Sequence, residues 1–345
     1  MKLGNKAIFI AGAGRMGRGI ALTLAYHGFQ VTLIDIKNRN HEEFERLKSI
    51  ALAEIKSQLK ILALSNVFPN EMIDLIVGRI EVCHMDHQPD IWQEADIVFE
   101  ALPEILSLKK VVYRQICSTL PKETLIASTT SSFSVNTLAE FVTHKDRFIN
   151  THWLNPAYLI PLVEVSPSIE TSDQSLKEMF QLLEGIGKVP IKCEPSPGFI
   201  VPRIQALAMN EASRLVKEGV ASIEDIDKAS RVGFGLRFAV LGLLEFIDWG
   251  GADTLYHASN YLKDSLKSNR FAPSEMIEEK MKSGDIGLKV KKGFYHFEET
   301  SLDQYQLETL QKFIDLLQHL GFITSPKDIS SVKEDLNEEI CNKNS

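Results

Sequence analysis

The sequence from Lys6 to Asp35, KAIFIAGAGRMGRGIALTLAYHGFQVTLID, decides the fold. It begins with a short apolar run that is typical of a buried strand, and a glycine-rich loop follows. An apolar stretch with helical spacing comes next, and a second apolar strand ends at Asp35. A strand, a glycine-rich loop, a helix, a second strand and an acidic residue, in this order, predict a doubly wound α/β sheet.

The glycine-rich loop has the spacing G-x-G-x-x-G, with Gly12, Gly14 and Gly17. Gly12 permits the tight turn, Gly14 lets the backbone approach a pyrophosphate, and Gly17 lets the helix pack close to the strand. The pyrophosphate would lie at the helix N-terminus, where free N–H groups and the helix dipole favour negative charge. We therefore expect a dinucleotide to bind at this loop, and we include Met16 among the binding residues.

Asp35 indicates which dinucleotide binds. Its carboxylate can accept hydrogen bonds from the ribose hydroxyls of the adenosine, and it repels a 2′-phosphate. This favours NAD over NADP, against which the nearby Lys37 and Arg39 have to be weighed. The alternative, a glycine turn without a ligand, does not explain why all the parts occur in order.

The composition is that of an ordinary soluble globular protein. The 345 residues suffice for two domains, with 44% hydrophobic and 24% charged residues. A net charge of −8 argues against nucleic acid as the main partner. Cys83, Cys117, Cys193 and Cys341 form no C-x-x-C pair, which predicts free thiols in a reducing, cytoplasmic compartment and no metal site. No apolar run approaches the roughly 18 residues of a membrane span, and no signal peptide is expected.

The first domain is expected to cover residues 1–193. Apolar strands alternate there with helical stretches, as in a parallel doubly wound sheet. The expected strands are Ala7–Ala11, Val31–Ile34, Asp96–Glu100, Leu125–Ser128, Arg147–His152 and Leu162–Val165. Charged, periodic residues from about 42 to 77 predict an inserted helical hairpin, which either projects into solvent or covers the ligand.

The stretch Glu194–Gly198, EPSPG, predicts a domain boundary. Beyond it an amphipathic helix is expected over 200–218, with Gly219 as its stop. Ser222 is expected to cap the next helix, with Asp225 three residues on, close to a capping box.

We therefore expect an all-α C-terminal domain over residues 194–300, with a turn at 233–236. Long apolar helices in such a domain often pack against a second subunit, which predicts a homodimer. Residues 301–345 are expected to form a helical tail with a frayed end.

His152 is the strongest candidate for proton transfer. It ends an expected strand in Thr151–Pro156, THWLNP, and ligands collect at the carboxyl ends of strands in open α/β sheets. An imidazole changes its charge near neutral pH, so it can take or give a proton. Glu164 lies in the next apolar strand, and a buried carboxylate needs a partner. We expect Glu164 to orient His152 and stabilise its imidazolium form; a histidine satisfied within the core is the alternative.

Other polar residues are less specific. The hydroxyls of Ser128–Ser132, STTSS, follow an expected strand and can bond a substrate hydroxyl or the nicotinamide ribose. A Ser/Thr turn that caps the next helix is equally compatible. Among the other histidines only His296 is notable, because it follows a glycine turn.

Together these motifs resemble the L-3-hydroxyacyl-CoA dehydrogenase family, and the closing KKGFYHF resembles its short-chain 3-hydroxybutyryl-CoA members. The resemblance runs from about Lys6 to Phe297. It rests on GAGRMG with Asp35, FEALPEILSLKK, STTSSF, THWLNP, LVEV, PGFIVPR, VKEGVASIEDIDKA and KKGFYHF. The resemblance implies an N-terminal Rossmann domain, an all-α C-terminal dimerisation domain, NAD as the hydride acceptor, and a place in fatty acid metabolism.

The resemblance also implies roles for single residues. His152 matches the catalytic base, Glu164 its partner, and Ser131 the serine that bonds the substrate oxygen. Glu104 and Lys109 match the pair beside the cofactor, from which Lys109 is expected to reach an anionic substrate as well.

Asn155 matches the asparagine that follows the histidine, and we expect it to bind substrate. Pro202 departs from the family, which has an active-site asparagine at this position of its GFIVNR motif. Proline cannot donate a hydrogen bond. Water or another residue, with Asn210 a distant candidate, would take over, or the substrate differs.

A second departure is Phe234–Ala239, FGLRFA, in place of a proline-glycine turn. The stretches NPAYLIPLVEV and GLRFAVLG are more similar to the branch that oxidises free hydroxy acids, such as gulonate and carnitine dehydrogenases and the lens lambda-crystallins. Arg237 could bind a free carboxylate bidentately. It could equally cap a turn or bridge a dimer.

The expected reaction is the NAD-dependent oxidation of the 3-hydroxyl of a short-chain L-3-hydroxyacyl-CoA, with His152 as general base. One alternative is the same chemistry on a free 3-hydroxy acid held by Arg237. Another is a non-catalytic NAD-binding scaffold, which Pro202 favours and the pair of His152 and Glu164 argues against. The expected partners are a small-molecule substrate and a second copy of the chain, with neither nucleic acid nor membrane.

Overall fold

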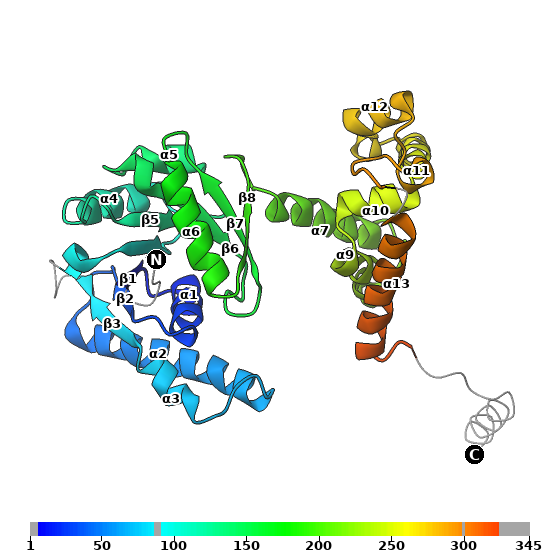
Figure 1. Ribbon diagram of the computed structural model, residues 1–345. Coiled ribbons are helices and arrows are strands. Elements are labelled where there is room, and N and C mark those ends of the chain that lie inside the picture. The colour runs from blue at the N-terminus through cyan, green and yellow to red at the C-terminus, as the bar shows by residue number, and fades with distance from the viewer. Residues whose placement is uncertain (1–5, 86–90, 299–300, 324–345) are drawn as a thin grey trace, which may run out of the picture. The chain divides into compact units, whose positions relative to one another are not determined.

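The computed structural model describes residues 6–85, 91–298 and 301–323 (Figure 1). The chain divides into two compact units, Met1–Met209 and Asn210–Ser345. The division falls within helix α7, Val201–Lys217, whereas the predicted boundary at 194–198 lies between the last strand and this helix. Cys341 and the predicted frayed end lie outside the described residues.

The first unit is built on one sheet of eight strands, in the order β3-β2-β1-β4-β5-β6-β7-β8. The strands are β1 Ile8–Ala11, β2 Val31–Asp35, β3 Ile80–His84, β4 Ile97–Glu100, β5 Leu125–Ser128, β6 Phe148–Trp153, β7 Leu162–Pro167 and β8 Val189–Lys192. This arrangement confirms the predicted Rossmann-like sheet. The sequence patterns missed β3 and β8.

The sheet is not parallel throughout, which corrects the expectation. Strands β6 and β7 pair antiparallel, and every other neighbouring pair is parallel. Only residues 154–161 join β6 to β7. A parallel crossover needs about a dozen residues or more. The short connection therefore forces the chain to turn back, and it places His152 directly opposite Glu164.

Helices cover both faces of the sheet, because each strand turns successive side chains to opposite faces. Ile8 and Ile10 pack with one set of helices: α1 Arg15–Tyr26, α2 His41–Leu64, α3 Met72–Val77 and α6 Asp173–Gly185. Phe9 and Ala11 pack with the other: α4 Leu106–Cys117 and α5 Val135–Ala139. The expected insertion near 42–77 consists of α2 and α3.

The second unit is helical. After α7 come α8 Ile223–Ala229, α9 Leu236–Val240, α10 Leu243–Gly250, α11 Ala252–Ser265, α12 Glu275–Ser283 and α13 Leu302–His319. The Ser222 hydroxyl accepts a hydrogen bond from the Asp225 amide at 3.1 Å, as an N-cap does. The predicted turn at 233–236 is wrong: a π-helical segment, Ser230–Gly235, runs directly into α9. Gly233 and Gly235 favour a turn in the sequence pattern, but a helix tolerates glycine at a modest cost in stability.

Asp248 organises the segment that contains the KKGFYHF motif. Its side chain is fully buried, and its two oxygens accept hydrogen bonds from the amides of Phe294 (2.9 Å) and Tyr295 (2.8 Å). A Cβ at Gly293 would lie 2.0 Å from Asp248 Oδ1, so glycine is required there. Among the described residues, Cys83, Cys117 and Cys193 are buried free thiols, and no helix has the length and apolarity needed to cross a membrane.

Candidate active site

The glycine loop after β1 has the geometry of a dinucleotide cradle. Gly12 has a φ of +116°, and a Cβ there would lie 2.6 Å from the carbonyl oxygen of Ala101. A Cβ on Gly17 would lie 2.0 Å from the Gly12 carbonyl oxygen. Gly14, which caps α1, has nothing within 4 Å of its Cβ position. Two glycines are therefore required by packing, and the third leaves open space before the α1 N-terminus, where a pyrophosphate fits.

A cavity of about 650 Å³ opens beside this loop, at the carboxyl ends of β1, β2 and β4. It contains most of the predicted cofactor-binding residues: Gly12, Gly14, Met16, Asp35 and Glu104 line it. The cavity also includes the serine predicted to bind substrate, Ser131. Size, glycine lining and the acid at its end all fit a dinucleotide.

His152 and Glu164 are paired, as the strand register places them. The Nδ1 atom of His152 lies 2.6 Å from Glu164 Oε2, and its Nε2 atom lies 3.1 Å from the Ser131 hydroxyl. The histidine is 5% exposed, and Glu164 is fully buried. The three residues predicted to act together are thus in one hydrogen-bonded chain.

The environment of Glu164 fixes the protonation of this chain. Its Oε1 atom accepts hydrogen bonds from the amides of Ile200 (2.9 Å) and Val201 (2.8 Å), where α7 begins. Burial raises the pKa of the Glu164 carboxyl, but the hydrogen bonds from His152 and the two amides outweigh burial and hold this pKa below its ordinary value. An ionised carboxylate only accepts, so Nδ1 of His152 carries a proton that it donates to Glu164.

Phe199, which was not among the predicted site residues, also positions the histidine. Its ring stacks on the His152 imidazole, with centroids 5.6 Å apart and an angle of 26°. Phe199 has a φ of +43° and Gly198 one of +73°. This left-handed turn, in the PGFIVPR motif, brings the Phe199 ring to His152 and the amides of the next two residues to Glu164. The sequence signal for this turn is Gly198, which belongs to the stretch that predicts a domain boundary.

Ser131 lies where the cavity and the histidine meet. Its amide donates to Glu104 Oε1 at 2.5 Å, and the Thr130 hydroxyl donates to the same carboxylate at 2.8 Å. Glu104, which also lines the cavity, therefore holds the Thr130–Ser131 turn in place.

Lys109 does not face the cavity, which corrects one expectation. It is fully buried, and its Nζ atom lies 2.6 Å from Glu100 Oε1 and 3.7 Å from Glu104 Oε2. Glu100 also accepts from the hydroxyls of Tyr113 (2.6 Å) and Ser128 (2.7 Å). In this structure Lys109 belongs to a buried network, is absent from the cavity lining, and is not exposed to an anionic substrate.

The remaining predicted residues are placed as follows. Asn155 is exposed just after β6, and Pro202 is the second residue of α7. A missing N–H is tolerated in the first helical turn, and the amides that Glu164 needs come from the two residues before Pro202. In the second unit, Arg237 lies over the Phe246 ring, 5.8 Å from its centroid, and His296 is exposed.

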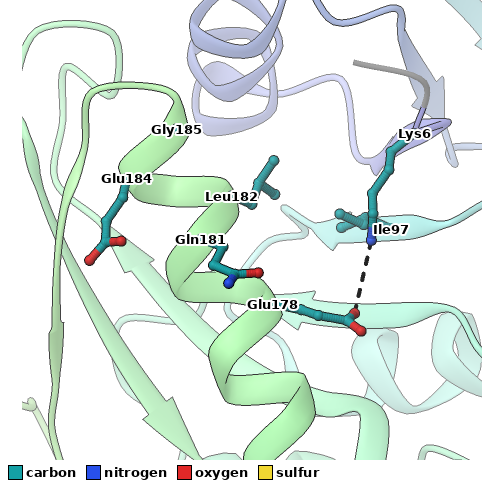
Figure 2. A pocket seen from close by; sticks show the side chains of 7 residues that line it. All are labelled: Lys6, Ile97, Glu178, Gln181, Leu182, Glu184 and Gly185. Carbon is teal, nitrogen blue, oxygen red and sulfur yellow. Dashed lines mark ion pairs between the residues drawn. The ribbon is translucent and has the colours of Figure 1, made fainter. Parts of the chain in front are cut away.

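A second hollow, of about 320 Å³, lies near the amino ends of the central strands β1 and β4 (Figure 2). It is lined by side chains of α6 together with Ile97, the first residue of β4, and Lys6, which lies 3.9 Å from Glu178 Oε2. It contains no predicted site residue. Among the residues that the structure describes, no group of three or more histidine, cysteine or acidic side chains could hold a metal ion.

Comparison with protein families agrees with this geometry. Residues 7–196 match the NAD-binding domain of 3-hydroxyacyl-CoA dehydrogenase, and residues 198–297 match its C-terminal domain. The two matches together contain the glycine loop, the histidine pair and the Asp248 turn.

Individual relatives cover nearly the whole matched region. A probable 3-hydroxybutyryl-CoA dehydrogenase from Bacillus subtilis (strain 168) is 32% identical over 85% of this chain and 98% of its own length. A 5-formyl-3-hydroxy-2-methylpyridine 4-carboxylate 5-dehydrogenase from Mesorhizobium japonicum is 30% identical over 89% of this chain and 96% of its own. The crystal structure of a 3-hydroxyacyl-CoA dehydrogenase from Archaeoglobus fulgidus has a TM-score of 0.71 and 30% identity, covering 92% of this chain and all of that one.

Proposed function

The chain belongs to the 3-hydroxyacyl-CoA dehydrogenase family and is an NAD-dependent oxidoreductase, and we propose that it oxidises the 3-hydroxyl of a short-chain L-3-hydroxyacyl-CoA, such as 3-hydroxybutyryl-CoA. The product would be the 3-oxo thioester. The relatives named 3-hydroxybutyryl-CoA dehydrogenase favour this substrate. The reaction belongs to fatty acid metabolism.

One observation carries the proposal: Ser131 lines the dinucleotide cavity and also lies 3.1 Å from His152 Nε2. A hydride acceptor in the cavity and a proton acceptor on the histidine would therefore lie close enough to act on the C–H and the O–H of one substrate alcohol. This is the arrangement that oxidation of an alcohol needs, because a hydride leaves carbon while a proton leaves oxygen.

The proposed roles follow from the hydrogen bonds. When bound, NAD supplies the acceptor for the hydride from C3. His152 Nε2 takes the hydroxyl proton, because Nδ1 already holds its proton against Glu164. The Glu164 carboxylate stabilises the imidazolium that forms, and the Ser131 hydroxyl bonds the substrate oxygen. As the C–H and O–H bonds break, the C3 carbonyl forms. Asn155 and Arg237 remain candidates for binding substrate.

The experiment that tests these roles replaces the base. His152→Ala should lower kcat for 3-hydroxybutyryl-CoA by about 10²–10⁴-fold, the usual contribution of a positioned general base. The dissociation constant for NAD, measured by calorimetry, should stay unchanged, because His152 does not line the cofactor cavity.

The matched control is His144→Ala, since His144 belongs to the same unit and lies outside the cavity. This variant should keep wild-type turnover. Near wild-type turnover by His152→Ala would contradict the assignment of the base.

A second candidate substrate is a free hydroxy acid. The relative from Mesorhizobium japonicum is named for a pyridine carboxylate, which favours this candidate. Arg237 is exposed, and no acidic side chain among the described residues forms an ion pair with it. Arg237→Ala should raise KM for a free acid more than tenfold if the guanidinium binds the carboxylate. An unchanged KM would assign Arg237 to structure alone.

We also propose that the chain forms a homodimer through its predicted C-terminal domain, residues 194–300, which includes all of α7. Helices α7, α8 and α9 contain no buried residue, and Leu207 and Met209 on α7 are 75% and 65% exposed. Exposed apolar stretches of this kind are typical of interfaces. Light scattering should give twice 38.8 kDa. Leu207→Glu should shift the mass towards the monomer, whereas Gln205→Glu, at a polar position of the same helix, should not. A monomeric wild type would contradict the proposal.

We also propose that the protein is located in the cytoplasm. It is supported by Cys83, Cys117 and Cys193, which are buried thiols without disulfide partners. Cell fractionation should find the protein with cytosolic markers, and its recovery with a membrane or a secreted fraction would contradict this.

A further inference from the structure

The adenosine end of the cofactor cavity holds an ion pair that the sequence did not reveal. Asp35 ends β2 and is 3% exposed. Arg39 Nε donates to its Oδ2 atom at 2.7 Å, whereas Oδ1 has only a long contact, 3.4 Å, from the Lys37 amide. One oxygen of the carboxylate is therefore occupied by a guanidinium, and the other remains able to accept from a ribose hydroxyl.

The same end of the cavity is rich in positive charge. Lys37 and Arg39 both line the cavity beside Asp35. A 2′-phosphate is commonly bound by an arginine near the ribose, whereas an acid at this place selects the unphosphorylated ribose. The chain thus carries residues for both outcomes, one acid and two cations, within five consecutive positions.

The loop that carries these cations is fixed at both ends. The His84 ring, on β3, lies with Nε2 2.9 Å from the Lys37 carbonyl oxygen. Downstream, the Asn40 side chain accepts from the Glu43 amide at 2.9 Å, and Glu43 accepts from the Asn40 amide at 3.1 Å, which forms a capping box at α2. Arg39 is held between these anchors, so its place does not depend on Asp35 alone.

We propose that the ion pair between Asp35 and Arg39 is the switch for cofactor selectivity. With Asp35 present, its charge neutralises Arg39 and repels a 2′-phosphate, and Arg39 aims Oδ1 at the ribose hydroxyls. When the charge of Asp35 is removed, Arg39 and Lys37 become a binding pair for the 2′-phosphate of NADP. The inference concerns the cofactor alone, and it does not depend on the substrate proposed above.

Calorimetric titration with NAD and with NADP tests the switch without any substrate. Asp35→Ser should weaken the binding of NAD by about tenfold or more. It should tighten the binding of NADP by about 10- to 100-fold, the range expected of a charge-assisted phosphate contact. The double variant Asp35→Ser/Arg39→Ala should lose most of the gain for NADP. Arg39→Ala alone should weaken NAD several-fold and still reject NADP.

The matched control adds Arg46→Ala to Asp35→Ser. Arg46 is exposed on α2 and does not line the cavity, so this double variant should keep the NADP affinity of Asp35→Ser. Equal NADP affinity of Asp35→Ser with and without Arg39 would overturn the proposal. An equal loss with Arg46→Ala would also overturn it, because net charge would then suffice. If Asp35→Ser fails to fold, an unchanged NAD affinity of Arg39→Ala would refute the aiming role of Arg39.

Discussion

The two units use buried charge differently. In the first, buried ionisable side chains gather at the edge of the sheet where ligands bind: Asp35, Glu100, Lys109, His152 and Glu164. In the second, Asp248 is the one fully buried acidic or basic side chain among the described residues, and it holds a turn. Burying a charge is costly unless it is paired. In the first unit we propose that the buried pair of His152 and Glu164 serves proton transfer, whereas in the second unit the buried Asp248 holds a turn.

The largest effect on the free energy of unfolding is expected from the replacement of Asp248. Asp248→Ala leaves the amides of Phe294 and Tyr295 without acceptors and opens a cavity. It should lower the free energy of unfolding by about 2–4 kcal/mol, measured by urea denaturation. NAD affinity should be retained below the transition, because the acid serves only its own unit.

The control for this change is Asp253→Ala, which removes an acid that pairs with Lys289 at the surface of the same unit. It should have little effect on unfolding. An Asp248→Ala protein as stable as wild type would show that the buried Asp248 does not stabilise the second unit.

Glu164 should show the opposite behaviour, with a large effect on rate. Glu164→Gln keeps the shape but removes the charge that stabilises the imidazolium, so kcat should fall about 100-fold. The pH profile of kcat should change as well, since the histidine loses its ionised partner. An unchanged profile would show that His152 and Glu164 do not act as a pair.

The lowered pKa of Glu164 adds a dependence of stability on pH. Because the folded pKa lies below the ordinary value of 4.5, the carboxylate stabilises the folded state fully above that pH. Its contribution is lost as the pH falls through the folded pKa. In Glu164→Gln this part of the acid-induced loss of stability should be absent, as acid unfolding followed by circular dichroism would show.

A smaller effect is expected at Lys188, a buried cation of the first unit outside the cofactor cavity. Its Nζ donates to the carbonyls of Ala157 (2.6 Å) and Ile160 (2.8 Å), in the loop between His152 and Glu164. Burial lowers its pKa from 10.5 to about 8. Between these pH values the unfolded chain binds the proton more tightly, so this contribution to stability should rise with pH, by about 1–3 kcal/mol.

Thermal unfolding from pH 8 to 10.5 would measure this rise. Lys188→Met should abolish it, whereas Lys192→Met, an exposed lysine on β8, should retain it. A slope that survives in Lys188→Met would assign the dependence to other groups.

Much of the fold could be predicted, because the signals were local. Six strands follow from apolar runs bounded by turn residues. Strand β8 was missed because its residues are half-exposed or exposed and it contains Pro190. The direction of β7 follows from the length of the loop before it, and that direction is what brings Glu164 opposite His152. A parallel strand would have placed the start of β7 at the other edge of the sheet. The boundary at 193/194 stays a prediction.

The side chains of the candidate site and the pairing of His152 with Glu164 could be predicted, but the backbone contacts that hold this pair could not. His152 and Ser131 are polar residues at or just after the end of a strand, and Glu164 is a carboxylate within an apolar strand, so all three stand out in the sequence. The amides of Ile200 and Val201 leave no side-chain signal, because they act through the backbone. The family resemblance implied that Lys109 reaches an anionic substrate, and only the fold shows that its ammonium group pairs with the buried Glu100.

The measurement that tests the central claim most directly is the rate of NADH formation with several substrates. Purified protein and NAD would be supplied with 3-hydroxybutyryl-CoA and, separately, with free 3-hydroxybutyrate, gulonate and carnitine. We expect turnover of the thioester and none of the free acids. Turnover of a free acid alone would contradict it and would make Arg237 the anchor of the substrate carboxylate.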